Sequence, residues 1–182
     1  SGFNPACLPA DLKSSWTVKL GGRLTQPVVA RGKVFVAAVD RHTLYALDSE
    51  TGTTAWQYTA GGRIDSSPTF YQGTILFGSA DGWVYCLDAV DGRLAWRRRV
   101  APFDRRIMWY GHLASTWPLS GGVIVQDDVV YAVAGFQAGY GVHAAALRLA
   151  DGAPVWQREA PITATRGVPK HSPRWIAWWS VG

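Results

Sequence analysis

Hydrophobic and polar residues alternate along most of this chain in short runs that end at turns rich in glycine. Alternation with a period of two is typical of β-strands, because successive side chains of a strand point to opposite faces of a sheet. Asp81-Gly82 lies between two of these runs, and Asp-Gly is a strong signal for a tight hairpin. The clearest runs predict one antiparallel four-stranded sheet, with strands at 66–71, 74–79, 83–88 and 94–99.

The same pattern recurs with a period of 40 residues. Trp16, Trp56 and Trp96 mark this period, and the strings Gly-Gly-Arg and Tyr-x-Leu-Asp repeat around them at the same interval. A third, weaker copy ends at Trp156, after an interval of 60 residues. Agreement of turn, apolar and aromatic positions within one period is typical of β-propeller blades, each of which is a four-stranded sheet.

The predicted fold class is therefore all-β: a partial β-propeller of four-stranded antiparallel blades, about three blades plus one strand. The remaining predicted strands are 25–30, 33–38, 43–48 and 54–59 in the first unit, 121–126, 128–134, 143–149 and 154–159 in the third, and 15–20 as the outermost strand of a preceding blade. The predicted organisation is a lead-in (1–14), propeller repeats (15–160) with blades 21–60, 61–100 and 120–160 and an insert at 101–120, and an irregular, tryptophan-rich basic tail (161–182).

Each repeated position has a structural role. The aspartate near the end of the third strand can accept hydrogen bonds from turn amides, and glycine supplies the positive φ that the turn needs. The tryptophan fills the gap between neighbouring sheets and buries roughly 150–250 Å². In the third copy Arg148 stands in place of the aspartate, which departs from the pattern of this turn. We assign to the repeat, and not to a ligand, the residues Trp16, Asp48, Gly52, Trp56, Asp88, Gly92, Trp96, Gly152 and Trp156.

These motifs carry a family resemblance. The residues Ala46-Leu47-Asp48, Thr51-Gly52 and Trp56 resemble the tryptophan-docking signature of the pyrroloquinoline-quinone-like (PQQ-like) propeller repeats, and 87–96 is similar to it. The resemblance covers roughly 15–159, and the wider pattern also looks like repeat proteins of planctomycete-type bacteria. The family includes quinone-dependent dehydrogenases, the propeller lipoprotein of outer-membrane assembly and sensor ectodomains, so the resemblance implies the fold and a periplasmic or cell-envelope location but no single activity.

The resemblance also concerns the number of blades. Propellers of this family usually close with seven or eight blades, whereas about three are predicted here. Sheets in an open arc leave two apolar flanks uncovered, and repeat arrays depend on their neighbours for burial. We therefore expect the partner to be a protein or the remaining blades of a longer parent chain, with self-association through open blade edges as the alternative.

Charge is concentrated in a few segments of the chain, which has a formal net charge of +5. Three arginines form the run 97–99, Arg105 and Arg106 follow, and the tail from Pro161 has three cations and no acidic residue. A basic surface can attract nucleic acid or anionic lipid, but a solvated outer face accounts for the same residues. Because the arginines belong to the strand motif of the repeat and not to a recognised nucleic-acid-binding module, we expect no nucleic-acid partner. No run of 18 or more apolar residues occurs, so no membrane span is predicted.

The long interval before Trp156 indicates an insertion of about twenty residues, roughly 101–120, between an outer strand and the next inner strand. Such a connection crosses one face of a propeller toward its central channel. Its aromatic and guanidinium groups suit the rings of a carbohydrate, quinone or nucleotide, or a partner surface. The alternative is that the insert plugs or buttresses the gap between blades, with its aromatic rings in the core. The candidate binding residues are Arg105, Arg106, Trp109, Tyr110, His112 and Trp117.

Two functions stay open on this sequence. The first is a non-catalytic binding or scaffolding module, a fragment of a larger repeat protein, with no catalytic residue, metal or cofactor assigned. The second is a fragment of a quinone-dependent alcohol or sugar dehydrogenase, for which the resemblance implies pyrroloquinoline quinone, calcium and a vicinal cysteine pair. Cys7 and Cys86 are not adjacent; they could form one disulfide, or Cys86 could pack as a small hydrophobe. No acidic cluster with calcium-ligand spacing occurs in the loops.

The tail after Pro161 has no repeat motif and contains three tryptophans. It could dock on an open blade edge or insert into a membrane interface. We favour a non-native end produced by truncation or a change of reading frame, because the repeat pattern stops abruptly. A degraded gene product without a function of its own is therefore a third alternative.

Overall fold

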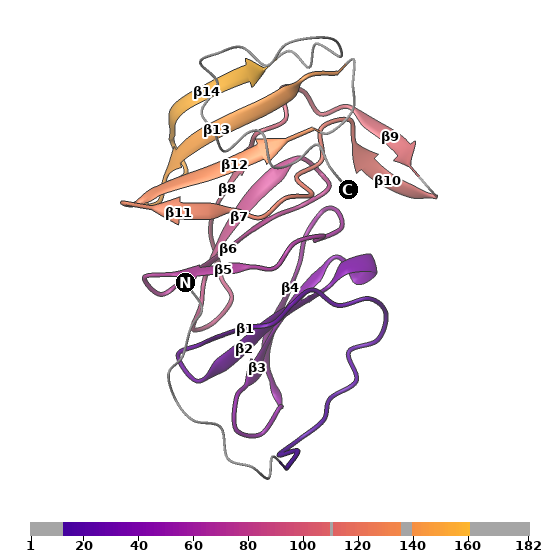
Figure 1. The fold of residues 1–182 in the computed structure, drawn as a ribbon, viewed down its shortest axis with the longest axis vertical. Coiled ribbons are helices and arrows are strands. Elements are labelled where there is room, and N and C mark those ends of the chain that lie inside the picture. Colours follow the sequence, from indigo (N-terminus) through magenta and orange to yellow (C-terminus); the bar gives the residue numbers. More distant parts are fainter. Residues whose placement is uncertain (1–12, 110, 136–139, 161–182) are drawn as a thin grey trace.

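The computed structural model describes residues 13–109, 111–135 and 140–160. These residues form three four-stranded antiparallel sheets, a separate two-stranded hairpin and one short 3-10 helix at Val39–Arg41. Each four-stranded sheet keeps its strands in chain order (Figure 1). The sheets are β1–β4 (Val28–Ala30, Lys33–Ala38, Thr43–Asp48, Thr54–Thr59), β5–β8 (Thr69–Tyr71, Thr74–Gly78, Trp83–Asp88, Leu94–Arg99) and β11–β14 (Ile124–Gln126, Val129–Ala134, Val142–Arg148, Pro154–Ala160).

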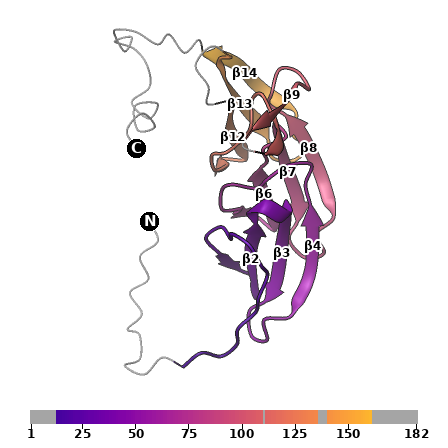
Figure 2. The same cartoon turned by 90° about the vertical axis from the view of Figure 1, so that its right-hand side faces the viewer.

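The three sheets follow one another along a curved stack (Figure 2). Their first strands, β1, β5 and β11, lie next to one another. The Thr69 hydroxyl just inside β5 donates to the carbonyl of Val123 at 2.5 Å, which ties the second sheet to the third along this side. Successive propeller blades have this arrangement, so the predicted fold class is confirmed.

Alternation along each strand lets a blade pack against both of its neighbours. In β6, Ile75 packs with Phe35 and Leu44 of the first sheet, whereas Leu76 packs with Val130 of the third. All of these side chains are fully buried. A strand that is buried on both faces needs apolar residues at successive positions, which explains the run Ile75-Leu76-Phe77 in the middle of β6. Most of the core therefore lies between sheets.

The repeated tryptophans join each blade to the next. The indole N–H of Trp56, on the last strand of the first blade, donates to the carbonyl of Ala89 in the second blade at 3.2 Å. The acceptor stands three residues before the turn glycine, Gly92. The other two bonds of this kind run from Trp16 to Ser49 at 3.0 Å and from Trp96 to Leu149 at 2.7 Å.

The turn glycines provide the flat surface on which these indoles lie. A Cβ added at Gly92 would stand 2.6 Å from two carbons of the Trp56 ring, and Gly92 also has a φ of +74°. Close approach and left-handed backbone each exclude a side chain there. The same holds for Gly52 against Trp16 and for Gly152 against Trp96.

The turn forms with or without the aspartate of the motif. In the first blade Asp48 accepts the amide and the hydroxyl of Thr51 at 2.9 and 3.0 Å, and the amide bond in particular lowers the pKa of Asp48. In the third blade, where Arg148 departs from the pattern, Asp151 accepts the Ala153 amide and the Arg148 guanidinium, both at 2.9 Å. The backbone bond that closes the turn is 2.9 Å in the first blade and 2.8 Å in the third, so the turn keeps its geometry.

Two predictions about strands are wrong. Residues 15–20 form no strand, because no described segment pairs with them, and an unpaired strand leaves its backbone groups without partners. The first strand of each blade also starts three residues later than predicted. Pro27 and Pro68 stand immediately before β1 and β5, and a proline has no N–H to contribute to a ladder.

Cys86 lies in β7, buried between the second and third sheets. Within the described residues it forms no disulfide, and Cys7 lies outside them. Burial raises the pKa of the Cys86 thiol from 9.0 to about 11. Only the thiolate is reactive, so the folded protein holds this sulfur in an inert form at neutral pH.

We therefore expect a Cys7→Ser variant to resist labelling by a disulfide-forming aromatic reagent at about pH 8 and to react fully once denatured. The same shift favours folding below about pH 9, and this contribution is lost as the pH rises through about 11, because the unfolded chain releases the thiol proton first. Absorbance of the released thiol measures the labelling. Rapid reaction in native buffer would show that β7 is open to solvent.

Candidate functional site

The insert between the second and third sheets folds into a hairpin, whereas no strand was predicted from sequence between 101 and 120. Strands β9 (Arg106–Trp109) and β10 (His112–Ser115) pair antiparallel, with Met108 opposite Leu113. Two residues join them, and the second, Gly111, has a φ of +79°. The hairpin lies at the edge of the stack, beside the third sheet (Figure 1).

The base of the hairpin is fixed to the turn between β6 and β7. The amide of Ser115 donates to the carbonyl of Ala80 at 2.7 Å, and the amide of Leu119 donates to the carbonyl of Ser79 at 3.1 Å. Gly82 permits this approach, because a Cβ at its position would stand 3.1 Å from Ser115 Oγ. The second blade therefore sets the position from which the hairpin leaves the sheet.

Trp117, just after β10, lies in the core. Its indole N–H donates to the carbonyl of Tyr140 at 2.6 Å. Its ring meets those of Tyr140 and His143 nearly edge-on, with centroids 6.4 and 5.7 Å away, and the ring of Phe103 at 6.2 Å. Trp117 is buried in the cluster between the second and third sheets, so it links the insert to the third blade.

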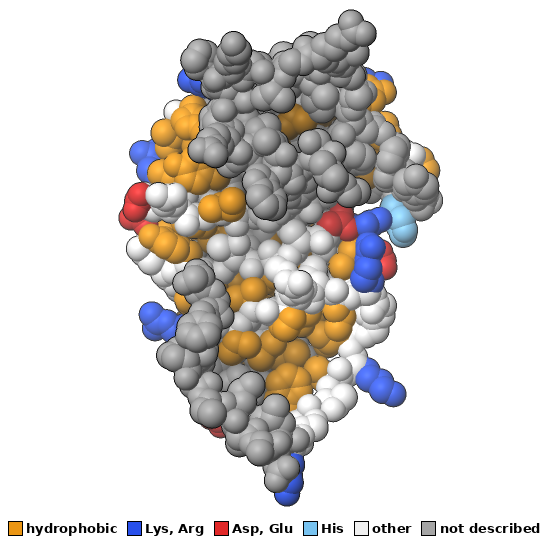
Figure 3. Space-filling view, viewed as in Figure 1, with side chains coloured by type: hydrophobic (Ala, Val, Ile, Leu, Met, Phe, Trp, Pro, Cys, Tyr) orange, Lys and Arg blue, Asp and Glu red, His pale blue; other side chains and the backbone are white. Residues whose placement is uncertain are grey.

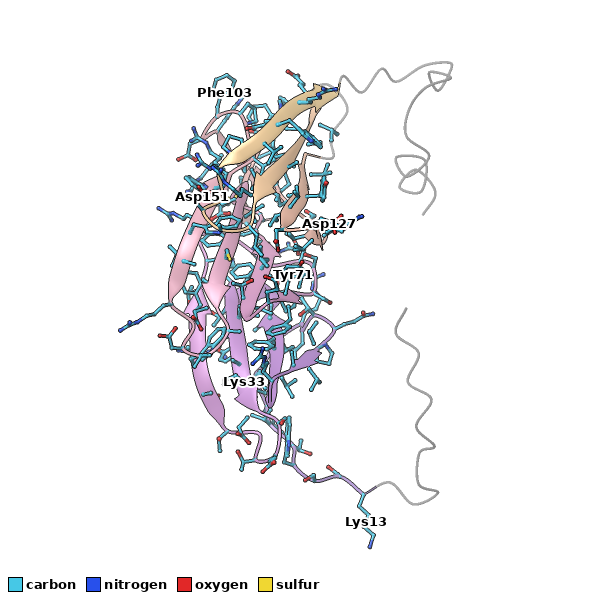
Figure 4. The ribbon with its side chains drawn as sticks, turned by 90° about the vertical axis from the view of Figure 1, so that its left-hand side faces the viewer. Lys13, Lys33, Tyr71, Phe103, Asp127 and Asp151 are labelled. Atoms are coloured by element: carbon cyan, nitrogen blue, oxygen red, sulfur yellow. The ribbon has the colours of Figure 1, made fainter. Side chains whose placement is uncertain are left out.

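The outer part of the insert exposes large apolar side chains. Phe103 is 68% exposed, Met108 71% and Leu113 54%. Met108 and Leu113 are directly opposite each other across the hairpin, so they share one face. Figure 4 shows Phe103 at the outer edge of the loop that leads to the hairpin, pointing away from the sheets.

The same insert carries two arginines and a histidine. The Arg105 guanidinium lies 5.6 Å from the centre of the Tyr140 ring, within the range of a cation–π contact. Arg106 pairs with Asp104 at 3.3 Å, with both side chains about half exposed. His112 is exposed on β10. The insert therefore presents more positive than negative charge at neutral pH.

The structure brings only some of the predicted site residues together. Arg105, Arg106 and His112 lie on or beside the hairpin with exposed side chains. Trp117 is separated from them in the core. Trp109 lies in β9, its side chain is not described, and Tyr110 lies outside the described residues.

Sequence reasoning missed Phe103, Met108 and Leu113 on the surface, as well as Tyr140 and His143 beneath the insert. Met108 is the single methionine of the chain and stands beside arginines, which is an unusual position for a core residue. The segment 135–141 is also longer than the corresponding turn 79–82 of the second blade. The insert at 101–120 and the long segment at 135–141 both depart from the repeat, and both connect strands on the same side of the blades. These two departures were the signal that the sequence offered for a site there.

Asp81 and Tyr85 form a buried pair that stabilises the turn beneath the hairpin. Asp81 accepts the Tyr85 hydroxyl at 2.5 Å and the Trp83 amide at 3.2 Å, and the Tyr85 oxygen accepts the Gly61 amide at 3.3 Å. Burial, and then the bond to the Asp81 carboxylate, raises the pKa of Tyr85 well above its usual range. Because these polar atoms are paired with one another, their role is structural.

The arginine run on β8 also has partners within the protein. Arg98 donates to the carbonyl of Gly152 in the next blade at 2.8 Å. The guanidinium carbons of Arg97 and Arg99 lie 4.9 and 5.8 Å from the centre of the Trp83 ring. The interpretation of these arginines as a solvated outer face is therefore incomplete, because they also contact a neighbouring blade and an aromatic ring.

The groups that the hairpin presents suit contact with a protein surface. The centres of protein–protein interfaces are enriched in large apolar side chains and in arginine, and the hairpin exposes both. Within the described residues, no three His, Cys, Asp or Glu side chains come together as metal ligands. In the same part of the chain, no helix is long and apolar enough to cross a membrane.

Comparison with known proteins matches this arrangement to bacterial propellers. Outer membrane protein assembly factor BamB of Burkholderia pseudomallei is 27% identical over 173 residues, which cover 92% of this chain and 40% of that protein. Putative dehydrogenase XoxF of Paracoccus denitrificans is 27% identical over 163 residues, which cover 81% of this chain and 26% of that protein. The chain therefore spans less than half the length of these relatives.

A solved structure and a family model agree with this result. The crystal structure of BamB from Moraxella catarrhalis matches with a TM-score of 0.58 and 25% identity, covering 74% of this chain and 40% of that one. The family model described as outer membrane protein assembly factor BamB matches residues 7–172, which include all three sheets and the hairpin. The chain belongs to this family of β-propeller repeat proteins.

Proposed function

We propose that this chain is part of a non-catalytic β-propeller that binds a protein partner in the periplasm or cell envelope, with hairpin β9–β10 as the contact element. The observation that carries the proposal is the exposure of Phe103, Met108 and Leu113 on an insert whose base is fixed to the second blade. Clustered exposed apolar side chains beside polar groups mark interaction sites in soluble domains.

A fixed base also favours binding energetically. A loop that orders only on binding loses conformational entropy at that moment, whereas a pre-formed hairpin avoids most of this cost. The bond from Ser115 to Ala80 and the burial of Trp117 hold the hairpin before any partner arrives. The names of the BamB relatives support a role in the assembly of outer membrane proteins.

The open flank of the third sheet supports the presence of neighbouring blades in the working protein. Ile124, Tyr131 and Trp156 stand in register across neighbouring strands of the third sheet, so their side chains form a row on one face. In the first blade Phe35 and Trp56 occupy the equivalent positions. Phe35 is fully buried against the second sheet, whereas Tyr131 is 37% exposed. Hydrophobic side chains near β11 are visible at the left of Figure 3. Further blades of a longer chain, or a second copy, would cover this row.

Site-specific photo-cross-linking tests the proposal. A photo-reactive residue at Leu113 should cross-link, in intact cells of the source bacterium, to a protein of the outer membrane assembly machinery. The same residue at Val90, which is more solvent-exposed than Leu113 but lies in the turn after β7, serves as the control. Adducts at Val90 alone, or none at either position, would refute the hairpin as the contact element.

A quinone-dependent dehydrogenase is the second candidate, because XoxF is as similar in sequence as BamB of Burkholderia. The described residues do not fit a calcium and quinone site by themselves: no cluster of acidic or histidine ligands forms among them, and Cys86 is buried alone in β7. Such a site would need ligands from other parts of the protein. Reduction of a dye by an alcohol, dependent on added quinone and calcium, would favour this candidate over the first.

A further inference from the structure

Among the described residues, the backbone groups on the outer edge of β9 have no hydrogen-bond partner. In an antiparallel pair, opposite residues alternate between those that exchange two hydrogen bonds and those whose N–H and C=O point outward. The amide of Thr116 donates to the carbonyl of Arg105, so this pair is of the bonded kind. Counting along the register, Arg106 and Met108 on β9, and Leu113 and Ser115 on β10, are of the outward kind.

The two edges of the hairpin differ in how much the protein covers them. On β10 the outward amide of Ser115 already donates to Ala80. On β9 no backbone hydrogen bond to the outward groups of Arg106 or Met108 is present within the described part of the chain. The β9 edge is therefore the one open to another strand, and a two-stranded sheet gains most from a third, because isolated hairpins are marginal in water.

Side chains on the open edge define what the added strand must carry. Arg106 and Met108 are two residues apart, so they point to the same face of the hairpin, the face that also holds Leu113. Side chains that face each other across neighbouring strands interact most strongly when they are both apolar or oppositely charged. A strand added to β9 would therefore place an apolar residue beside Met108 and an acidic residue beside Arg106.

Charge around the hairpin favours the same partner. Arg105 and Arg106 outnumber Asp104, the one acidic residue between 101 and 120. Asp104 lies in the loop before β9 and is half exposed, so its pairing with Arg106 is easily exchanged for a partner's carboxylate. An acidic segment would therefore be attracted to the start of β9, where both arginines stand.

We propose that β9 recruits an extended segment of its protein partner by strand addition, and that this segment alternates apolar and acidic residues on one face. This inference rests on the proposed function, because it names the kind of partner that the hairpin binds. Main-chain bonds to Arg106 and Met108 would supply affinity, and the two side chains would supply specificity. The probe is a fluorescein-labelled peptide, Thr-Val-Thr-Glu-Thr-Val-Thr-Glu, followed by fluorescence anisotropy.

The decisive variant is Met108→Pro. Its missing N–H points away from β10, so the internal ladder is retained, and proline is tolerated on edge strands with this orientation. We expect the peptide to bind the wild-type chain in a saturable manner and Met108→Pro to weaken binding at least about tenfold. The matched comparison is Met108→Ala, which removes the same side chain but keeps the outward amide of β9, and it should weaken binding clearly less than Met108→Pro. Unchanged protection of the Ser115 and Leu119 amides in hydrogen exchange shows that each variant keeps the hairpin base.

Peptide controls separate backbone from side-chain recognition. Replacement of both glutamates by lysine should weaken binding, and a central proline in the peptide should abolish it. Equal binding of the proline-containing peptide, or of Met108→Pro, would overturn strand addition. A Met108→Pro variant that keeps the Leu113 cross-link in cells would leave the proposed function standing while strand addition falls. A dimer of the chain that Met108→Pro dissociates, seen by light scattering, would make a second copy the occupant and would also overturn the proposal.

Discussion

Replacing Trp96 with alanine is expected to lower the free energy of unfolding by about 3–5 kcal/mol, the range for truncation of large buried aromatic residues. Trp96 is buried between the second and third blades, its ring lies against Gly152, and its N–H is bonded to the carbonyl of Leu149. The variant loses the apolar contact and leaves a cavity that the glycine turn cannot fill. It also leaves the carbonyl of Leu149 without its hydrogen-bond donor. The third blade should therefore separate from the second more readily.

Trp156→Ala provides a matched control within the same chain. Trp156 has the same register in its blade as Trp96, but no glycine turn of a following blade lies against it within the described residues, where its ring contacts Tyr131 instead. Because it is only partly buried, its truncation should cost clearly less than that of Trp96. Urea denaturation followed by circular dichroism measures both variants. Equal losses would show that docking on the glycine turn adds no stability beyond local packing.

Replacing Trp117 with alanine is expected to have the second large effect, again about 3–5 kcal/mol if the insert and the third blade unfold together with the rest. The side chain is buried among Phe103, Tyr140 and His143, and its N–H donates to the carbonyl of Tyr140, which holds the insert to the third blade. Without it, the amides that fix the hairpin base should exchange faster. Binding of a partner at the hairpin should weaken as a consequence.

Two further substitutions separate the causes of this effect. Trp117→Phe keeps an aromatic ring but loses the N–H donated to Tyr140, so it should retain most of the stability and lose about 1–3 kcal/mol. Met108→Ala removes an exposed side chain and should change stability by less than about 0.5 kcal/mol. Denaturant titration and hydrogen exchange of Ser115 and Leu119 compare all three. If Trp117→Ala left the exchange of these amides unchanged, the hairpin would be fixed by the turn between β6 and β7 alone.

Local chemistry explains why most of the blades could be predicted from sequence. The second, third and fourth strands of each sheet begin and end within about one residue of their predicted bounds, because alternation and turn glycines are local signals. The third-blade turn, where Arg148 departs from the motif, still forms, because Asp151 and the positive φ of Gly152 are sufficient to close it. The first strands of the first and second blades were predicted less well, since Pro27 and Pro68 each remove a donor that periodicity does not register.

The sequence alone determined the period, the second to fourth strands of each blade, the turns between them and the family of this protein, because each depends on residues close together in the chain. Only the tertiary structure decided which aromatic residues are buried and which edges are open. Trp117 and Phe103 stand in the same insert, yet one lies in the core and the other in solvent. Likewise, Trp96 and Trp156 have the same motif but different surroundings. Burial depends on what lies opposite a side chain, and here that is a different blade, dozens of residues away in the sequence.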